Sequence, residues 1–137
     1  MARQKPDGIV RLMVAGVLKL TERDITRQVC DFMWAHGWRG IRMQSGLMGR
    51  PSGGAFRVGE PGMPDWLFVR YVHPEHATGW VAAQCAEVLW VEVKAPGKWL
   101  SSAQVAWHER ERMRGGIVAV VDDIDVYRDW YAREVGL

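Results

Sequence analysis

The chain has 137 residues, of which 48% are hydrophobic and 25% are charged, and its formal net charge is +2. This composition is typical of one folded globular domain, residues 1–137, and excludes an intrinsically disordered chain. No apolar stretch reaches the length of a membrane helix. Cys30 and Cys85 form no C-x-x-C pair, so we expect two reduced thiols in a cytoplasmic protein rather than a disulfide framework or a structural zinc site.

Helical periodicity begins after an N-terminal arm, residues 1–20. Thr21 followed by Asp24 resembles a capping box, and apolar side chains then recur at helical spacing. The pattern predicts a helix over Glu22–His36, with Glu22 in its first turn. A short strand is predicted over Trp38–Gln44.

The segment Ser45–Met63 contains six glycines and two prolines and is predicted to be a loop. A loop of about 19 residues is long for a compact domain, and such loops are usually functional or mobile. Glycines would let its main chain approach a phosphate backbone closely. A plain surface loop is the alternative.

Two runs rich in strand-forming residues, Asp65–His73 and Glu87–Lys94, predict strands joined by a wide hairpin connection. Ser101 and Gln104 then form a second capping-box pattern, which predicts a helix as far as about Arg114.

The last two elements follow two glycines. Ile117–Val121 is wholly apolar, as expected for a buried central strand. Asp122 or Asp123 would cap a last helix with aromatic residues on its inner side. The predicted order is therefore a helix, three strands, a helix, a strand and a helix.

Charged side chains stand at one end of the predicted hairpin. Asp65 opens its first strand, and Glu92 and Lys94 lie near the end of its second, pointing to the same face. Neighbouring strands lie roughly 5 Å apart, so Asp65 can come close to Glu92. Two close carboxylates repel each other unless a cation lies between them, and their oxygens suit Mg²⁺ or Mn²⁺. The alternative is a Glu92–Lys94 ion pair on the solvent face of an edge strand.

The residues around these charges resemble the virus-type replication-repair nuclease (VRR-NUC) family of the PD-(D/E)xK nuclease superfamily. The resemblance covers about residues 21–121 and rests on Gly62-Met63-Pro64-Asp65, Glu92-Val93-Lys94, and Leu100-Ser101 with Gln104. It implies an α/β fold with a restriction-endonuclease-like core, a mixed central β-sheet flanked by helices in α-β-β-β-α-β order plus a C-terminal helix. The chain departs from the family in an insertion around His73–Gln84.

The resemblance also implies a metal-dependent DNA endonuclease that cuts branched, flap or four-way junction DNA in replication, repair or recombination. Lys94 would activate the attacking water and stabilise developing negative charge, and Gln104 would orient Lys94 or a water. Mg²⁺ or Mn²⁺ would be bound by Asp65, Glu92, the Val93 carbonyl and Glu22. The implied catalytic residues are Asp65, Glu92, Lys94, Gln104 and Glu22.

Fourteen of the eighteen basic residues are arginine, the better bidentate phosphate ligand. Trp99 lies near the expected site and could stack on an unpaired base. The eight tryptophans suit a homodimer interface as well as a core. Phosphate contacts are expected from Arg39, Arg42, Arg50, Arg57, Lys98, Arg110, Arg112 and Arg114, for which solvated surface positions are the alternative.

Two other functions stay open. One is a restriction-type nuclease that reads a short sequence, and the other is a non-catalytic DNA-binding module with a nuclease fold. The family resemblance further suggests a nucleoid-associated protein of viral or mobile-element origin.

Overall fold

A computed structural model describes residues 19–71 and 86–136. The expectations for the N-terminal arm, for Cys85 and for the insertion before the second hairpin strand fall outside these residues. The described elements are α2 (Glu22–Ala35), β1 (Arg39–Arg42), β2 (Gly46–Gly49), β3 (Ala55–Val58), β4 (Trp66–Tyr71), β5 (Ala86–Val93), α3 (Ser102–Met113), β6 (Ile117–Val121) and α4 (Ile124–Glu134).

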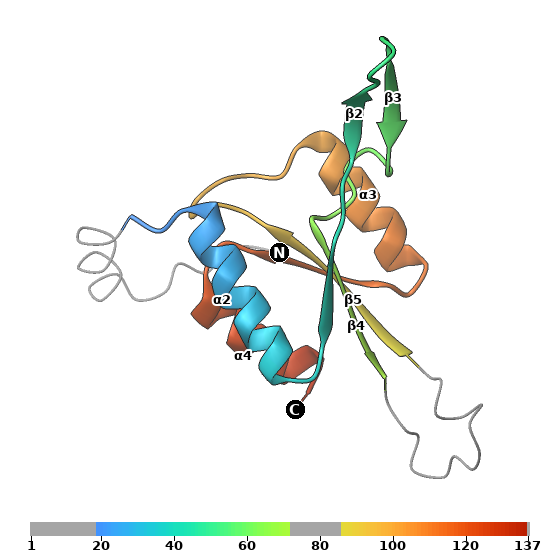
Figure 1. Ribbon diagram of the computed structural model, residues 1–137. Helices are drawn as coiled ribbons and strands as arrows, with labels where there is room; N and C mark the ends of the chain where they lie inside the picture. The colour runs from blue at the N-terminus through green and yellow to red at the C-terminus, as the bar shows by residue number, and fades with distance from the viewer. Residues whose placement is uncertain (1–18, 72–85, 137) are drawn as a thin grey trace.

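A four-stranded sheet in the order β1-β4-β5-β6 forms the centre of the molecule (Figure 1). β1, β4 and β5 are antiparallel neighbours, whereas β6 runs parallel to β5. The parallel pair needs a crossover connection, which α3 supplies. The mixed sheet flanked by helices confirms the predicted fold class.

The helices cover the two faces of the sheet unequally, with α2 and α4 on one side and α3 on the other (Figure 1). Side chains alternate along β5. Leu89, Val91 and Val93 lie in the core that α2 and α4 complete. Trp90 instead contacts Trp107 of α3. Glu92, which is two residues after Trp90, therefore faces α3 as well.

Both predicted capping boxes are confirmed. The Thr21 hydroxyl accepts from the backbone N–H of Asp24, and the Asp24 carboxylate accepts from that of Thr21. Ser101 and Gln104 make the same reciprocal pair at the start of α3. Each box satisfies backbone donors that the first turn of a helix leaves open. The sequence therefore located the start of both helices correctly.

The prediction of a structureless loop over Ser45–Met63 was wrong. Residues Gly46–Gly49 and Ala55–Val58 pair as an antiparallel two-stranded sheet that projects from the body (Figure 1). We call this hairpin, residues 46–58, the arm. Its strands are four residues long and largely exposed. The usual alternation of buried and polar residues, which identifies a strand in a sequence, is therefore absent.

The prediction of a central position for β6 was also wrong, because β6 lies at one edge of the sheet among the described strands. Its side chains are nevertheless mostly buried, since α3 and α4 pack against it from opposite faces. A strand whose two faces are both covered by helices is apolar even when it lies at the edge of a sheet.

In the described part of the chain, no helix is long and apolar enough to cross a membrane.

Candidate active site

β4 and β5 bring Asp65 and Glu92 together. Trp66 pairs with Val91, so Asp65, one residue earlier, stands opposite Glu92 and on the same face of the sheet. The Asp65 Oδ2 atom accepts a hydrogen bond of 3.1 Å from the backbone N–H of Val93. This bond fixes the Asp65 carboxylate beside the end of β5.

The Glu92 side chain is only 2% exposed and lies between the sheet and α3. Its Oε1 atom accepts from the Gln104 Nε2 atom at 2.6 Å and pairs with the Lys94 Nζ atom at 3.1 Å. Its Oε2 atom is buried and has no hydrogen-bond partner among the residues that the structure describes. One oxygen of this carboxylate therefore has two partners, and the other has no hydrogen-bond partner among the described residues.

Burial, and after it the negative charge of Asp65, raise the pKa of Glu92 to about 7, although the hydrogen bond and charge of Lys94 act in the opposite direction. The carboxyl therefore holds its proton up to a much higher pH than a glutamate in water. A divalent cation beside it would favour the ionised form. The open Oε2 atom and the neighbouring Asp65 carboxylate are oxygen ligands of the kind that Mg²⁺ and Mn²⁺ prefer, so these residues fit such an ion.

Gln104 joins the start of α3 to the acidic pair. Its Oε1 atom accepts from the backbone N–H of Ser101 at 2.9 Å, while its Nε2 atom donates to Glu92. Because the capping box uses the carbonyl oxygen, the amide NH₂ has to face the carboxylate. The same residue thereby starts the helix and orients Glu92.

This double role gives a specific expectation for Gln104→Ala. Loss of the Nε2 donor removes a hydrogen bond to the ionised form of Glu92, so the pKa of that carboxyl should rise further. The midpoint of Mn²⁺ binding, measured by titration calorimetry as a function of pH, should therefore move upward. Ser101→Ala is the matched control, because it also breaks the capping box but keeps the bond to Glu92. Equal pH profiles for the two variants would contradict this role.

Gly62 fixes the segment before Asp65 against α3. Its φ is +82°, and a Cβ atom built there would lie 2.1 Å from the Ala103 carbonyl oxygen and 2.8 Å from the Gln104 nitrogen. Only glycine permits so close an approach. Pro64, which follows, is fully buried. The Gly-Met-Pro-Asp segment therefore packs directly on the turn that carries Gln104.

His108 is a buried histidine of α3 that was not among the site residues expected from the sequence. It lies one helical turn beyond Gln104 and is 0% exposed. Burial, together with the positive charges of Arg112 and Lys94, lowers its pKa to about 4. The ring is therefore neutral at pH 7. It adds no second positive charge near Lys94.

Two residues of the expected metal site are placed differently from Asp65 and Glu92. Glu22 is exposed in the first turn of α2, the helix that covers the opposite face of the sheet. The Val93 side chain lies in the core on that same opposite face. Among the described residues, no group of three possible His, Cys, Asp or Glu ligands gathers. The roles of Glu22 and of the Val93 carbonyl stay predictions.

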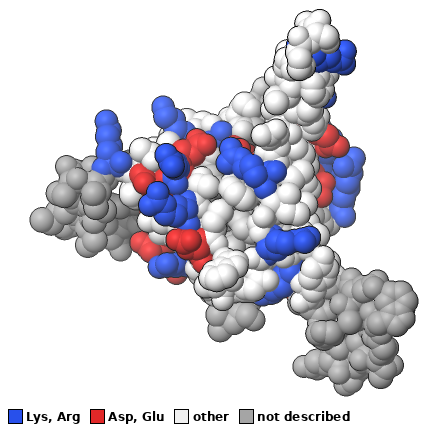
Figure 2. Space-filling model, viewed as in Figure 1, with Lys and Arg blue, Asp and Glu red and all other residues white. Residues whose placement is uncertain are grey.

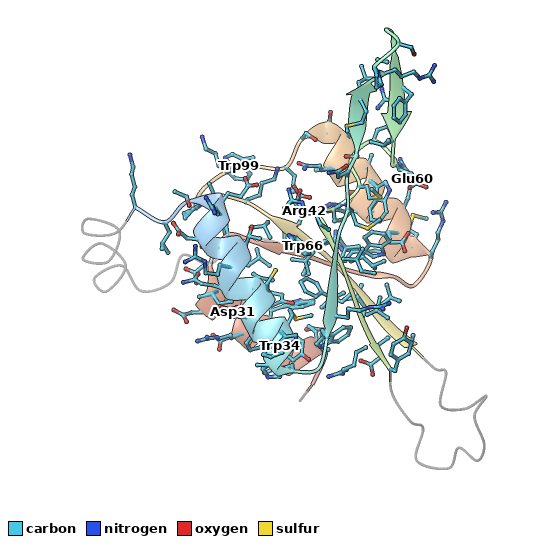
Figure 3. The ribbon with its side chains drawn as sticks, in the orientation of Figure 1. Asp31, Trp34, Arg42, Glu60, Trp66 and Trp99 are labelled. Atoms are coloured by element: carbon cyan, nitrogen blue, oxygen red, sulfur yellow. The ribbon has the colours of Figure 1, made fainter. Side chains whose placement is uncertain are left out.

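The residues expected to contact phosphate are spread over several elements, and acidic side chains lie between basic ones on the visible face (Figure 2). Arg42 lies over the Trp66 ring, 5.5 Å from its centroid, near the centre of Figure 3. Arg112 is not free, because it donates to the Val118 carbonyl oxygen at 2.8 Å. The remaining expected contacts, all exposed, are Arg39 on β1, Arg50 and Arg57 on the arm, Lys98 after β5, Arg110 on α3, and Arg114 at the C-cap of α3.

Trp99 lies on the connection between β5 and α3 and is 79% exposed (Figure 3). An exposed aromatic ring therefore lies on the connection that follows Lys94. In comparisons with known proteins, no family model matches the chain, and no curated protein matches it.

Proposed function

We propose that the chain is a divalent-cation-dependent deoxyribonuclease of the VRR-NUC type, which hydrolyses phosphodiester bonds in DNA. The observation that carries this proposal is the buried Glu92 carboxylate, which has one unpartnered oxygen, stands beside Asp65 and pairs with Lys94 on the same face of the sheet. A purely structural ion pair would need neither the second carboxylate nor the open oxygen. Such an arrangement is costly unless a cation neutralises it.

Asp65 and Glu92 would hold Mg²⁺ or Mn²⁺. When bound, the cation would polarise the scissile phosphate and lower the pKa of a water molecule. The Lys94 ammonium group supplies a fixed positive charge on the same side of the sheet, where negative charge develops during hydrolysis. Gln104 keeps the Glu92 carboxylate in one orientation, so that little reorganisation is needed during the reaction.

We propose that the substrate is branched DNA, such as a flap or a four-way junction, and that the active enzyme is a homodimer. Trp34 and Trp99 are large apolar side chains that the described surface leaves exposed, which supports an interface or a base-stacking role. Digestion of unbranched plasmid DNA into discrete fragments would instead favour a restriction-type nuclease. Sedimentation that shows only monomer at micromolar concentration would contradict the homodimer.

The decisive test is cleavage of flap, splayed and four-way DNA substrates with Mn²⁺ or Mg²⁺, followed by addition of EDTA and by Lys94→Ala. EDTA should abolish cleavage, and the substitution should slow it by about 100-fold, the usual cost of removing a group that stabilises transition-state charge. Lys19→Ala, which removes an exposed lysine before α2, is the matched control and should cleave normally.

Two outcomes would contradict the proposal. Cleavage that persists in EDTA or that Lys94→Ala leaves unchanged would exclude the mechanism. DNA binding without cleavage under any of these conditions would favour the non-catalytic module.

A further inference from the structure

The arm is anchored at both ends to the residues of the candidate active site. On its entering side, Met43 donates a backbone hydrogen bond of 2.7 Å to the Asp65 carbonyl oxygen, three residues before β2 begins. On its returning side, Gly62 lies against the backbone of Ala103 and Gln104. Glu60 accepts a hydrogen bond of 2.6 Å from the Trp107 indole N–H, beside α3 (Figure 3). The arm thus rises from the same end of the molecule that carries Asp65, Glu92 and Lys94.

The arm carries positive charge only. Residues 46–58 include Arg50 and Arg57 and no aspartate or glutamate. Blue side chains but no red ones lie on its projecting part in Figure 2. Arg50 is held over the Phe56 ring, 5.4 Å from its centroid, at the start of a turn in which the Gly53 N–H donates to the Arg50 carbonyl oxygen. An element with this charge complements a polyanion.

The arm is also narrow and unpartnered. Leu47 and Arg57 are paired on one face, and Met48 and Phe56 on the other. All four are exposed, with Leu47 at 69%. A lone two-stranded hairpin is marginally stable in water, so a ribbon exposed on both faces suits an element that becomes covered by a ligand. Its strands lie roughly 5 Å apart, and the major groove of duplex DNA, about 12 Å wide, admits a two-stranded ribbon.

We infer that the arm is a duplex-binding element, which lies in the major groove next to the cleaved bond and contacts the phosphates on its walls through Arg50 and Arg57. This inference rests on the proposed nuclease function, since it names the part of the substrate that this end of the molecule holds. Contacts of this kind position the duplex without reading its sequence. Binding of DNA, and not the chemical step, should therefore depend on the arm.

The test compares the double variant Arg50→Ser/Arg57→Ser with Arg128→Ser/Arg133→Ser, which removes two exposed arginines from α4. Fluorescence anisotropy gives the Kd for a four-way DNA as a function of salt concentration. Hydrolysis of bis(p-nitrophenyl) phosphate with Mn²⁺ reports the chemistry, because this diester is too small to reach the arm. Sedimentation velocity reports the oligomeric state of each variant.

We expect the arm variant to raise the Kd about tenfold at moderate salt and to reduce the slope of log Kd against log salt by about 1.8, since each phosphate contact contributes about 0.9. The small diester should be hydrolysed as by the unaltered chain. A Kd and a salt slope equal to those of the α4 variant would overturn the inference. A shift from dimer to monomer with an unchanged salt slope would overturn it too, because the arm would then bind a second copy of the chain.

Failure of the nuclease proposal gives a different result. In that case the unaltered chain hydrolyses neither DNA nor the small diester, while the salt slopes of the two double variants still decide whether the arm binds duplex DNA.

Discussion

Glu92→Gln is expected to abolish Mn²⁺-dependent DNA hydrolysis and, at the same time, to stabilise the cation-free protein at pH 8. The two effects have one cause. Glu92 is buried beside Asp65, so its ionised form is unfavourable without a cation. Glutamine keeps an oxygen that can accept from Gln104 or Lys94 but carries no charge to be buried.

The sign of the stability effect follows from the two pKa values of this carboxyl. In the unfolded chain the pKa is 4.5, and in the folded chain burial raises it to about 7. Between these values the folded state holds a proton that the unfolded state has released, so the free energy of unfolding falls as the pH rises from about 4.5 to about 7. Above pH 7 the loss is complete. Glu92→Gln removes this pH dependence and should gain on the order of 3 kcal/mol at pH 8, because each tenfold change in the proton affinity of the carboxyl corresponds to about 1.4 kcal/mol.

Urea unfolding at pH 5 and pH 8, with and without Mn²⁺, measures both effects. Without the ion, the unaltered chain should lose stability between the two pH values, and Glu92→Gln should lose less. Mn²⁺ should stabilise the unaltered chain at pH 8, by about 2.7 kcal/mol at a concentration 100 times its Kd, and should leave Glu92→Gln unchanged.

Glu109→Gln, which removes an exposed carboxylate from α3, is the control for loss of one negative charge and should respond like the unaltered chain. Stabilisation of Glu92→Gln by Mn²⁺ would contradict the assignment of this carboxylate to the ion. A lower stability of Glu92→Gln than of the unaltered chain at pH 8 would show that its ionised form is already compensated in the cation-free protein.

The acidic pair could be predicted from the sequence because it depends on short-range rules. Alternation along β5 puts Glu92 and Lys94 on one face, and an antiparallel hairpin brings the start of β4 to the end of β5. The capping pattern at Ser101 gave the start of α3 in the same way. Each of these inferences needs only the residues within one element or one hairpin.

The features that the sequence did not reveal depend on packing between distant segments. Gln104 is visible as a capping residue, but its bond to Glu92 requires the side of the sheet on which α3 lies. The bond between Trp107 and Glu60 joins residues 47 positions apart. The arm has strands that are too short and too exposed to show a pattern of buried and polar residues. The burial of β6 depends on helices that pack on both of its faces. Local patterns do not contain this information.

Gly62→Ala is expected to have the second large effect, because it acts on the contact that holds α3 beside the acidic pair. The added Cβ atom would lie 2.1 Å from the Ala103 carbonyl oxygen, and the backbone there is at a φ of +82°. The neighbouring atoms are backbone, so they cannot rotate away. Either the Gly62 segment or the first turn of α3 has to move. We expect a loss of stability of about 3 kcal/mol from the overlap together with the strained φ.

Movement of that turn would also displace Gln104 from Glu92, so Mn²⁺-dependent hydrolysis should fall more steeply than the folded fraction does. Gly115→Ala separates the two causes, since Gly115 has a φ of +93° at the other end of α3 and nothing within 4 Å of its added Cβ atom. This control should lose only about 1–2 kcal/mol, the cost of placing alanine in the left-handed region. Urea unfolding and a hydrolysis assay of both variants measure the difference. Equal losses of stability, or full activity of folded Gly62→Ala, would show that the contact between Gly62 and α3 does not position the active site.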